Sequence, residues 1–325
     1  MSEKKEVVLS VQDLVVKFNL RGKVLTAIRG ISMDLYKGES LAIVGESGSG
    51  KSVFTKTFMG LLDNNGWVDS GTIQYHEYDL AKFKKEKEWI QIRGKRIAMV
   101  FQDPMTSLNP LKTIGKQIQE AFTLHNKVSA EDAKKRTLEL LADVGIPDPE
   151  RRYKQYPHEF SGGMRQRVVI AIAMACVPEI LICDEPTTAL DVTIQAQILN
   201  LLRDLQAKYG LTVIYITHDL GVVANVADRI AVMYAGDIVE IGTCEEVFYD
   251  PKHPYTWALL SSLPQLGIKG EDLYSIQGTP PNLFNQIHGD AFAPRNPQAL
   301  KIDFVARPPY FEVSPTHKAR TWLLD

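Results

Sequence analysis

Cysteine and long apolar runs are both scarce in this chain of 325 residues. The three cysteines, Cys176, Cys183 and Cys244, are an odd number, and two of them stand among apolar residues, as small core side chains do. They indicate neither a disulfide framework nor a metal site. The longest apolar run, Val168 to Val177, ends at Pro178 and is well short of the roughly 20 residues that span a bilayer. We therefore predict no transmembrane segment.

An excess of positive charge is also missing. Lys and Arg number 37 against 39 Asp and Glu, which gives a formal net charge of −2. Domains that coat nucleic acid usually carry a strong basic excess. The first six residues, Met-Ser-Glu-Lys-Lys-Glu, mix both signs and precede only a short apolar run, unlike a secretory signal peptide. The sequence thus predicts a cytosolic chain with no nucleic-acid partner.

The remaining composition is that of a globular protein. Hydrophobic residues make up 45% and charged residues 23%, and the length predicts two domains with a possible small third. Short strand-like runs fill residues 7–44, helix-like stretches fill 113–144, and strand-like and helix-like runs alternate over 180–234. Such alternation is what a mostly parallel sheet with crossover helices requires. We expect an α/β fold with an N-terminal antiparallel β subdomain and an inserted helical subdomain.

Proline is concentrated near the C-terminus. Ten of the 17 prolines follow Asp250. Because proline lacks a backbone N–H and fixes its own φ, this composition does not suit another doubly wound domain. It predicts an irregular C-terminal extension with one helix near Tyr255 to Ser262.

The segment Gly45 to Ser52 matches the phosphate-loop pattern G-x-x-x-x-G-K-[ST] in full. It follows the apolar run Leu41 to Val44 and precedes a helix-like stretch, which is the context that the pattern requires. Glycines let backbone N–H groups curl around a triphosphate, and a helix N-terminus adds favourable partial charge. Lys51 is predicted to reach the β and γ phosphates, and the Ser52 hydroxyl to hold Mg²⁺.

Polar side chains follow three further strand-like runs. Asp184, after Ile180 to Cys183, is predicted to hold Mg²⁺, and Glu185 is the candidate general base for the attacking water. Gln102 and His218 end two other runs, where Gln102 would sense metal and water and His218 would contact a phosphate oxygen. A lone histidine at a strand end is more often structural, so its position alone does not assign a role to His218.

The run Phe160-Ser-Gly-Gly-Met-Arg-Gln-Arg167 resembles the signature motif of ATP-binding cassette (ABC) ATPases. With it the family's motifs occur in order along the whole chain, including a D-loop at Ala189-Leu190-Asp191. Phe18 stands where the family places an aromatic that stacks on adenine, although a lone Phe in a strand is equally typical of a core.

The ABC resemblance implies ATP and Mg²⁺ as ligands and assigns roles to particular residues. The implied catalytic residues are Glu185, His218 and Gln102, and the implied metal-binding residues are Ser52, Gln102 and Asp184. The implied nucleotide-binding residues are Phe18, Gly45, Glu46, Ser47, Gly48, Ser49, Gly50, Lys51, Ser52, Ser161, Gly162, Gly163, Gln166 and Asp191.

Finer matches resemble the importers of oligopeptides, dipeptides and nickel, and among them the D-type ATPase subunits of Gram-positive oligopeptide permeases. They are Phe101 to Pro110, Ile216 to Leu220, His253 to Thr256 and Gly278 to Pro281. The resemblance implies a P-loop NTPase (ABC ATPase) core over 1–102 and 176–250. It also implies a helical subdomain with the signature motif over 103–175 and an oligopeptide-permease-type extension over 251–325.

The same resemblance implies partners. In ABC ATPases the Ser-Gly-Gly of one cassette binds the γ-phosphate held by another, which implies a dimer. We expect a heterodimer with a paralogous F-type ATPase subunit, two membrane-spanning permease subunits and an extracellular peptide-binding lipoprotein. The chain would be peripheral on the cytoplasmic face of the cell membrane, and Asp103 to Pro110 with the helices that follow would form the coupling surface.

The predicted function is ATP hydrolysis that powers import of oligopeptides through separate membrane subunits. Dipeptides and nickel stay open as cargo, because no residue in this chain selects among them. A non-transport ABC ATPase usually has a long coiled-coil insertion or two tandem cassettes, and an exporter cassette lacks the Pro-rich extension. A silent ATP-binding subunit is disfavoured by the intact Lys51, Asp184, Glu185 and His218.

Many members of this subfamily hold an iron–sulfur cluster with four cysteines in the extension. The matching positions here are Asp290, Asn296, Asp303 and Thr321. Because such clusters need thiolates, we predict no cluster and an extension that folds by packing alone. Protein purified anaerobically should contain neither iron nor labile sulfide in colorimetric assays, and stoichiometric amounts of both would contradict the prediction.

Overall fold

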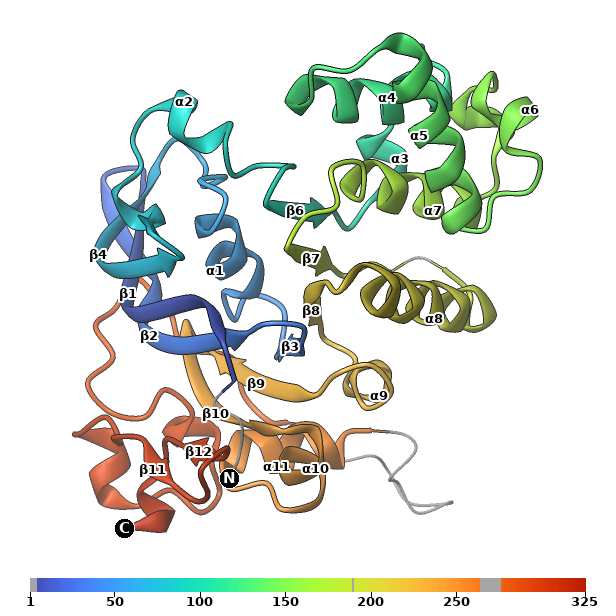
Figure 1. Ribbon diagram of the computed structural model, residues 1–325. Coiled ribbons are helices and arrows are strands. Elements are labelled where there is room, and N and C mark those ends of the chain that lie inside the picture. Colours follow the sequence, from blue (N-terminus) through green and yellow to red (C-terminus); the bar gives the residue numbers. More distant parts are fainter. Residues whose placement is uncertain (1–4, 189, 264–275) are drawn as a thin grey trace. The chain divides into compact units, whose positions relative to one another are not determined.

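The computed structural model describes residues 5–188, 190–263 and 276–325. The chain divides into two compact units, each of which combines strands with helices (Figure 1). The first unit contains the chain up to Phe83 and again from Ile216 onward, and the second contains Lys84–Tyr215. Strand β8 (Thr212–Thr217) crosses the boundary between them. No helix in the described part of the chain is long and apolar enough to cross a membrane.

The first unit begins with an antiparallel sheet in the order β2-β1-β4-β5. Its strands are β1 (Val7–Leu20), β2 (Lys23–Tyr36), β4 (Gly66–Tyr75) and β5 (Tyr78–Asp79). Arg21 and Gly22, both at positive φ, form the two-residue turn that joins β1 to β2. This sheet confirms the predicted N-terminal antiparallel β subdomain.

A second set of strands in the first unit carries the phosphate loop. In the order β11-β12-β10-β9-β3, the strands are β11 (Phe311–Glu312), β12 (Lys318–Ala319), β10 (Asp237–Thr243), β9 (Arg229–Tyr234) and β3 (Ser40–Val44). β3 is parallel to β9 and buried at every residue, as a continuous apolar run predicts. The helices of this unit are α1 (Lys51–Thr57), η1 (Leu80–Lys82), α9 (Leu220–Val223), α10 (Cys244–Tyr249) and α11 (Pro254–Ser261).

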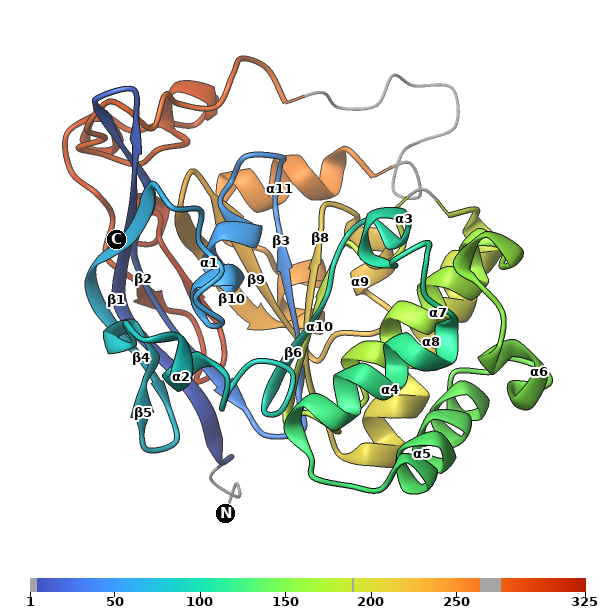
Figure 2. The same cartoon turned by 90° about the horizontal axis from the view of Figure 1, so that it is seen from above.

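The second unit pairs two parallel strands, β6 (Ile97–Val100) and β7 (Ile180–Asp184), both fully buried. Its helices are α2 (Glu86–Trp89), α3 (Pro104–Ser107), α4 (Ile114–His125), α5 (Ala130–Asp143), α6 (Pro149–Tyr153), η2 (Pro157–Glu159), α7 (Gly162–Ala173) and α8 (Val192–Tyr209). Within this unit α4, α5, α7 and α8 pack in succession (Figure 2). The strand-to-helix crossover from β7 into α8 is the α/β connection that the sequence predicts.

The longest helix, α8, shows how the sequence sets its bounds. Asp191 caps the N-terminus, where its carboxylate accepts a hydrogen bond from the Ile194 N–H at 3.0 Å. Gly210 ends the helix in the left-handed conformation at φ 66°. Ile198, Leu202 and Leu205 recur at helical spacing and are buried. One apolar face and two capping residues therefore define this helix.

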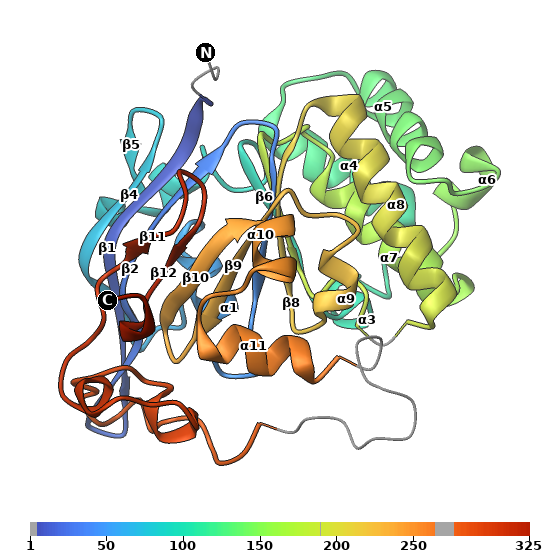
Figure 3. The same ribbon diagram turned by 90° about the horizontal axis from the view of Figure 1, so that it is seen from below.

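The C-terminal extension adds strands and short helical turns to the first unit. β12 pairs antiparallel with β10, with Glu240 opposite Ala319, so the end of the chain extends the sheet (Figure 3). The remaining regular pieces are the 3₁₀ turns η3 (Ala293–Arg295), η4 (Lys301–Phe304) and η5 (Trp322–Leu324). The predicted helix near Tyr255 is α11, and the rest of the described extension is irregular, as its prolines indicate.

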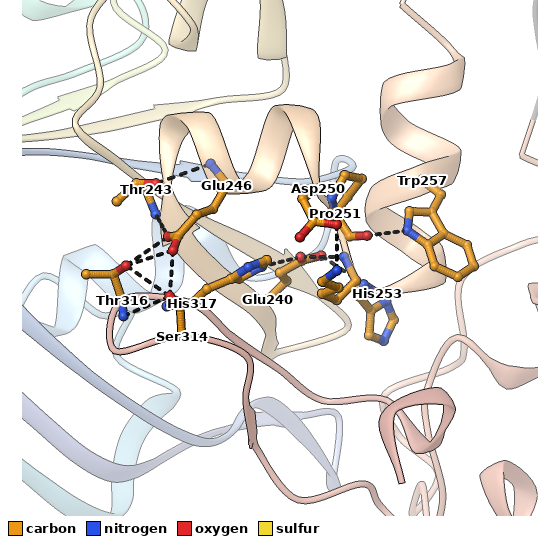
Figure 4. A network of polar contacts seen from close by, with 11 residues as sticks. Glu240, Thr243, Glu246, Asp250, Pro251, His253, Trp257, Ser314, Thr316 and His317 are labelled. Atoms are coloured by element: carbon orange, nitrogen blue, oxygen red, sulfur yellow. Dashed lines mark hydrogen bonds and ion pairs between the residues drawn. The ribbon is translucent and has the colours of Figure 1, made fainter.

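Two carboxylates, Glu240 of β10 and Glu246 of α10, hold this extension through hydrogen bonds (Figure 4). The fully buried Glu240 accepts hydrogen bonds from the backbone N–H groups of Lys252 and His253. Its carboxylate also contacts the His317 ring nitrogen Nε2 at 2.7 Å. Glu246 accepts hydrogen bonds from the hydroxyls of Ser314 at 2.5 Å and Thr316 at 2.8 Å. Satisfied hydrogen bonds of this kind offset the cost of burying a carboxylate.

The four positions that the resemblance matched to cysteines share one local role. Each side chain is buried, and each uses an oxygen to accept a hydrogen bond from a nearby backbone N–H. The pairs are Asp290 with Phe292 at 3.0 Å, Asn296 with Gln298 at 2.9 Å, Asp303 with Leu300 at 2.6 Å and Thr321 with Leu323 at 3.3 Å. Short polar side chains favour such turns. These positions therefore cap turns of the extension.

Glu246 makes the attachment of the extension sensitive to acid. Burial by itself raises the pKa of this carboxyl, but hydrogen bonds from Ser314, Thr243 and Thr316 outweigh that effect and lower the pKa from 4.5 to about 2. A depressed pKa contributes stability that is present above about pH 4.5 and is lost as the pH falls toward 2. Glu246→Gln should lower the melting temperature by a few degrees at pH 7, and the difference from wild type should shrink toward pH 2.

Glu245→Gln is the matched control, because Glu245 is an exposed neighbour on the same helix. It removes the same charge and should leave the melting temperature nearly unchanged. Thermal unfolding followed by circular dichroism across pH 2–7 measures both variants. An equal deficit for Glu246→Gln at every pH would contradict the electrostatic explanation.

Candidate functional site

The phosphate loop Gly45–Ser52 joins β3 to α1, as the sequence predicts. Gly45, Gly48 and Gly50 all have positive φ, at 150°, 81° and 102°. A Cβ on Gly45 would lie 2.1 Å from the carbonyl oxygen of Met233 on the neighbouring β9. The loop therefore curls tightly against β9 in a conformation that only glycine permits at this point.

Lys51 closes the loop from the inside. Its Nζ donates hydrogen bonds to the carbonyl oxygens of Gly45 at 2.7 Å and Glu46 at 2.9 Å, and the residue is only 7% exposed. The ammonium group thus already lies at the centre of the curled backbone. Ser52 follows as the second residue of α1 and is half-buried. Because the loop combines left-handed glycines, a helix start and a central lysine, it fits the phosphates of a nucleotide.

Glu46 has partners that the sequence does not reveal. Its backbone N–H donates to the Tyr255 hydroxyl at 2.8 Å, and its carboxylate forms a two-bond ion pair with Arg295. Tyr234 at the end of β9 accepts a hydrogen bond from the same arginine at 3.2 Å. The sequence did contain one indication of these partners. Glu46 is a carboxylate inside a phosphate-binding loop, where a nearby cation is needed to neutralise its charge. Nothing local identified which cation that is.

The two carboxylates at the end of β7, Asp184 predicted for the metal and Glu185 for catalysis, lie in the second unit. Asp184 ends β7 and is 7% exposed, and Glu185 follows it with φ 46°. Gln102 donates a hydrogen bond from Nε2 to Glu185 Oε2 at 2.7 Å, and Thr188 donates its hydroxyl to the same oxygen at 2.9 Å. The structure thus brings Gln102 and Glu185 into direct contact. Thr188 is an additional partner that the sequence motifs did not indicate.

The signature residues form the start of α7. Ser161 is its N-cap, and the Ser161 hydroxyl accepts a hydrogen bond from the Met164 N–H at 3.4 Å. Gly162 and Gly163 are the first two helical residues, and a Cβ on Gly163 would lie 2.8 Å from Ile194 Cγ2. Gln166 is buried at 1% exposure, and its Nε2 has no hydrogen-bond partner among the described residues. Ser161 and Gly162 are exposed, so the helix start is open to a ligand.

The remaining predicted residues are divided between the two units. Phe18 is 8% exposed, and its ring packs on Gly66, where a Cβ would lie 2.5 Å from Phe18 Cε1. His218 follows β8 in the first unit and is exposed. Asp191, in the second unit, is exposed and caps α8, while Ala189 of the predicted D-loop lies outside the described residues. Because Phe18 is buried, it is a core side chain of the antiparallel sheet in this structure.

The side chains of the site can be compared with the ligands that the predicted Mg²⁺ would need. Among the described residues there is no group of three or more His, Cys, Asp and Glu side chains that could hold a metal ion by itself. In a phosphate-loop site the nucleotide supplies part of the coordination, and the protein adds a hydroxyl and a carboxylate. Ser52 and Asp184 are residues of those two kinds.

Two protein families match the chain. Residues 28–188 match the ABC transporter family, and residues 239–302 match the C-terminal region of the oligopeptide/dipeptide transporter family. The second match includes Tyr255 and Arg295, the partners of Glu46. The two families together therefore cover both the phosphate loop and the part of the extension that contacts it.

Curated relatives match over nearly the full length. The oligopeptide transport ATP-binding protein AmiE of Streptococcus pneumoniae is 60% identical over 324 residues, which cover 100% of this chain and 91% of AmiE. The oligopeptide transport protein OppD of Bacillus subtilis is 59% identical, with 97% and 88% covered. The dipeptide transport protein DppD of Lactococcus lactis is 58% identical, with 100% and 93% covered.

Solved structures of ABC cassettes share the fold. The dimeric, post-hydrolysis cassette MJ0796 bound to ADP and Pi superposes with a TM-score of 0.65 at 27% identity, over 73% of this chain and 98% of that one. The cassette cbiO1 of Clostridium perfringens superposes with a TM-score of 0.66 at 30% identity, over 76% and 92%. These neighbours confirm the predicted α/β fold class.

One prediction about partners is wrong. The resemblance led us to expect a heterodimer with a paralogous F-type ATPase subunit. Both matching families and the curated relatives are ABC transporter proteins, and an F-type partner conflicts with that family. The error has a physical origin. A partner is selected by residues on both sides of an interface, and this chain supplies only one of those sides.

The close approach of Gly45 to β9 yields a test of the loop. Gly45→Ala places a methyl group 2.1 Å from a backbone carbonyl, which neither strand can move away from cheaply. We expect it to abolish measurable ATP binding and to lower the free energy of unfolding by more than the roughly 1–2 kcal/mol of backbone strain alone. Equilibrium titration with a fluorescent ATP analogue and urea unfolding measure the two effects.

Gly38→Ala is the matched control, because Gly38 has φ 74° but nothing lies within 4 Å of its Cβ position. It should cost backbone strain without a clash and should leave ATP binding intact. Wild-type ATP affinity in Gly45→Ala would contradict the assignment of this loop.

Proposed function

Because this chain belongs to the ABC transporter family, among the ATP-binding proteins of oligopeptide and dipeptide transport, we propose that ATP binds at Gly45–Ser52 and that Glu185 activates the attacking water. The activity itself follows from the family: the chain is an ATPase that powers peptide import. Both oligopeptide and dipeptide occur in the relatives' names, so peptide is the cargo class.

The observation that carries the proposal is the glycine-dependent curl of the phosphate loop around Lys51. The lysine Nζ already lies between the Gly45 and Glu46 carbonyls, so it needs only to exchange a carbonyl for a phosphate oxygen. Such an exchange requires little new desolvation of the ammonium group, because Lys51 is buried before the ligand arrives. Loop and lysine are therefore pre-organised for a polyphosphate.

Glu185 is the proposed general base, and two side chains orient it. Gln102 and Thr188 both donate to Oε2, so the carboxylate is held in one orientation from which it can accept a proton from water. The Ser52 hydroxyl and the Asp184 carboxylate are the groups that would hold Mg²⁺. When bound, Mg²⁺ supplies positive charge that stabilises the phosphate oxygens. We propose that Gln102 contacts the metal and the water. We propose that His218 contacts a phosphate oxygen.

The start of α7 is the proposed contact to a second nucleotide. Ser161, Gly162 and Gly163 present a capped helix N-terminus, which favours a phosphate. We propose that Gln166 and Asp191 support this contact and that the phosphate belongs to ATP held by a second ABC cassette. The dimeric MJ0796 cassette supports such an arrangement. Opening and closing of two cassettes would drive separate membrane permeases fed by a binding protein, so we place the chain peripherally at the cytoplasmic face of the membrane.

Glu185→Gln tests the proposed base. The amide keeps the hydrogen bond to Thr188 but cannot accept the proton, so phosphate release should fall by at least about 100-fold while ATP affinity stays near wild type. A phosphate-release assay and nucleotide titration, with the membrane partners present, measure the two quantities. Asp204→Asn, an exposed charge removal in the same unit, should leave both unchanged. Turnover that persists in Glu185→Gln would exclude Glu185 as the base.

A further inference from the structure

A buried arginine of the C-terminal extension grips the phosphate loop. Arg295 Nη1 donates to Glu46 Oε2 at 2.7 Å, and Nη2 donates to Glu46 Oε1 at 3.0 Å. The Arg295 side chain is 5% exposed, and 249 residues separate the partners in sequence. Two parallel hydrogen bonds between a guanidinium and a carboxylate fix both distance and orientation. Glu46 is therefore held in a single position by the extension.

The other donors of Arg295 are used as well. Nε donates to the Gln277 carbonyl at 2.9 Å, and Nη1 also donates to the Tyr234 hydroxyl at 3.2 Å. The guanidinium lies near the faces of Tyr234 and Phe292, with Cζ 5.8 and 5.9 Å from the ring centroids. Hydrogen bonds to Glu46 raise the pKa of Arg295 above its already high ordinary value, although burial opposes them. The arginine is thus a permanent, immobilised cation.

Glu46 connects this cation to the lysine of the loop. Its backbone N–H is bound by the Tyr255 hydroxyl at 2.8 Å, and its carbonyl oxygen accepts from Lys51 Nζ at 2.9 Å and from the Ser49 N–H at 3.2 Å. The side chain, the N–H and the carbonyl of one loop residue are therefore all engaged. Arg295 and Tyr255 hold it from the extension, and Lys51 and Ser49 hold it from within the loop.

The extension also borders the loop beyond this ion pair. Pro280, Pro281 and Leu283 line a small pocket together with Glu46–Ser49 and Tyr234. The Leu283 carbonyl accepts a hydrogen bond from the Thr26 N–H of β2 at 3.2 Å, which fastens that segment to the antiparallel sheet. The loop thus meets the extension along several residues.

We propose that Arg295 is a positioning residue that clamps the phosphate loop through Glu46, so that the C-terminal extension sets the affinity for ATP. The proposal rests on the proposed role of Gly45–Ser52 in binding the phosphates. The clamp acts in two ways. It fixes the loop backbone in its curled shape before ATP arrives, and it neutralises a carboxylate that would otherwise repel the phosphates.

The second effect provides a discriminating experiment. Arg295→Met leaves the Glu46 charge unpaired beside the loop, and we expect it to weaken ATP binding by roughly tenfold or more. Glu46→Gln in the same background removes that charge, so the double variant should recover to within about threefold of wild type. A purely structural arginine would show no such rescue. Equilibrium titration of the full-length chain with Mg-ATP and a fluorescent ATP analogue measures each dissociation constant.

Two further variants separate the clamp from general damage to the fold. Arg320→Met removes another arginine of the extension, a half-buried one that donates to the Pro308 carbonyl and stacks on Tyr310 with Cζ 3.8 Å from the ring centroid. It should lower the melting temperature without changing ATP affinity. Arg295→Lys keeps the charge but loses the paired geometry, so it should weaken binding less than Arg295→Met. It also preserves the test if the methionine variant fails to fold.

The outcomes distinguish the clamp from the ATP site on which it acts. If Lys51→Ala loses ATP binding while folded Arg295→Met and Arg295→Lys both bind like wild type, the clamp is refuted and the loop assignment stands. The clamp is also refuted, with the loop assignment intact, if Arg295→Met is weakened but Glu46→Gln gives no rescue. If Lys51→Ala binds ATP as tightly as wild type, the loop assignment fails and the clamp fails with it.

Discussion

The contact between the backbone of Gly45 and the Met233 carbonyl is the constraint on which the site depends. With no Cβ at Gly45, β3 ends close enough to β9 for the loop to curl back over the strand. That curl places the Gly45 and Glu46 carbonyls around the Lys51 ammonium. The residue after Met233 is Tyr234, whose hydroxyl meets Arg295. One strand therefore shapes the phosphate loop and leads from it to the C-terminal extension.

The extension belongs to the nucleotide-binding unit as part of its core. Glu240 and Glu246 bind it with buried or partly buried hydrogen bonds, β12 lengthens the sheet, and Arg295 reaches into the phosphate loop. These contacts explain how a proline-rich segment with few regular elements is held against the unit. Side-chain oxygens of the extension cap its turns, and its charged side chains form ion pairs and hydrogen bonds with the rest of the unit.

The sequence was sufficient wherever the chemistry is local. The order of glycines and the lysine in Gly45–Ser52 predicts both the loop and its place between a buried strand and a helix. Strand ends single out Gln102 and Glu185 as separate candidates, and the hydrogen bond between them is a finding of the structure. It was insufficient for Arg295 and Tyr255, because their contacts with Glu46 join segments more than two hundred residues apart. Phe18, one candidate for stacking on adenine, has its ring packed on Gly66. The prediction of an F-type partner was wrong because the residues of one chain do not by themselves determine which partner binds them.

The central claim is that the loop and the extension respond to ATP as one body. Hydrogen–deuterium exchange of the full-length chain with and without Mg-ATP measures this directly. We expect amides of residues 46–52 and of 292–297 to gain protection together, at the same ATP concentration. Protection of the loop with no change at 292–297 would contradict the coupling, and protection confined to other segments would contradict the site itself.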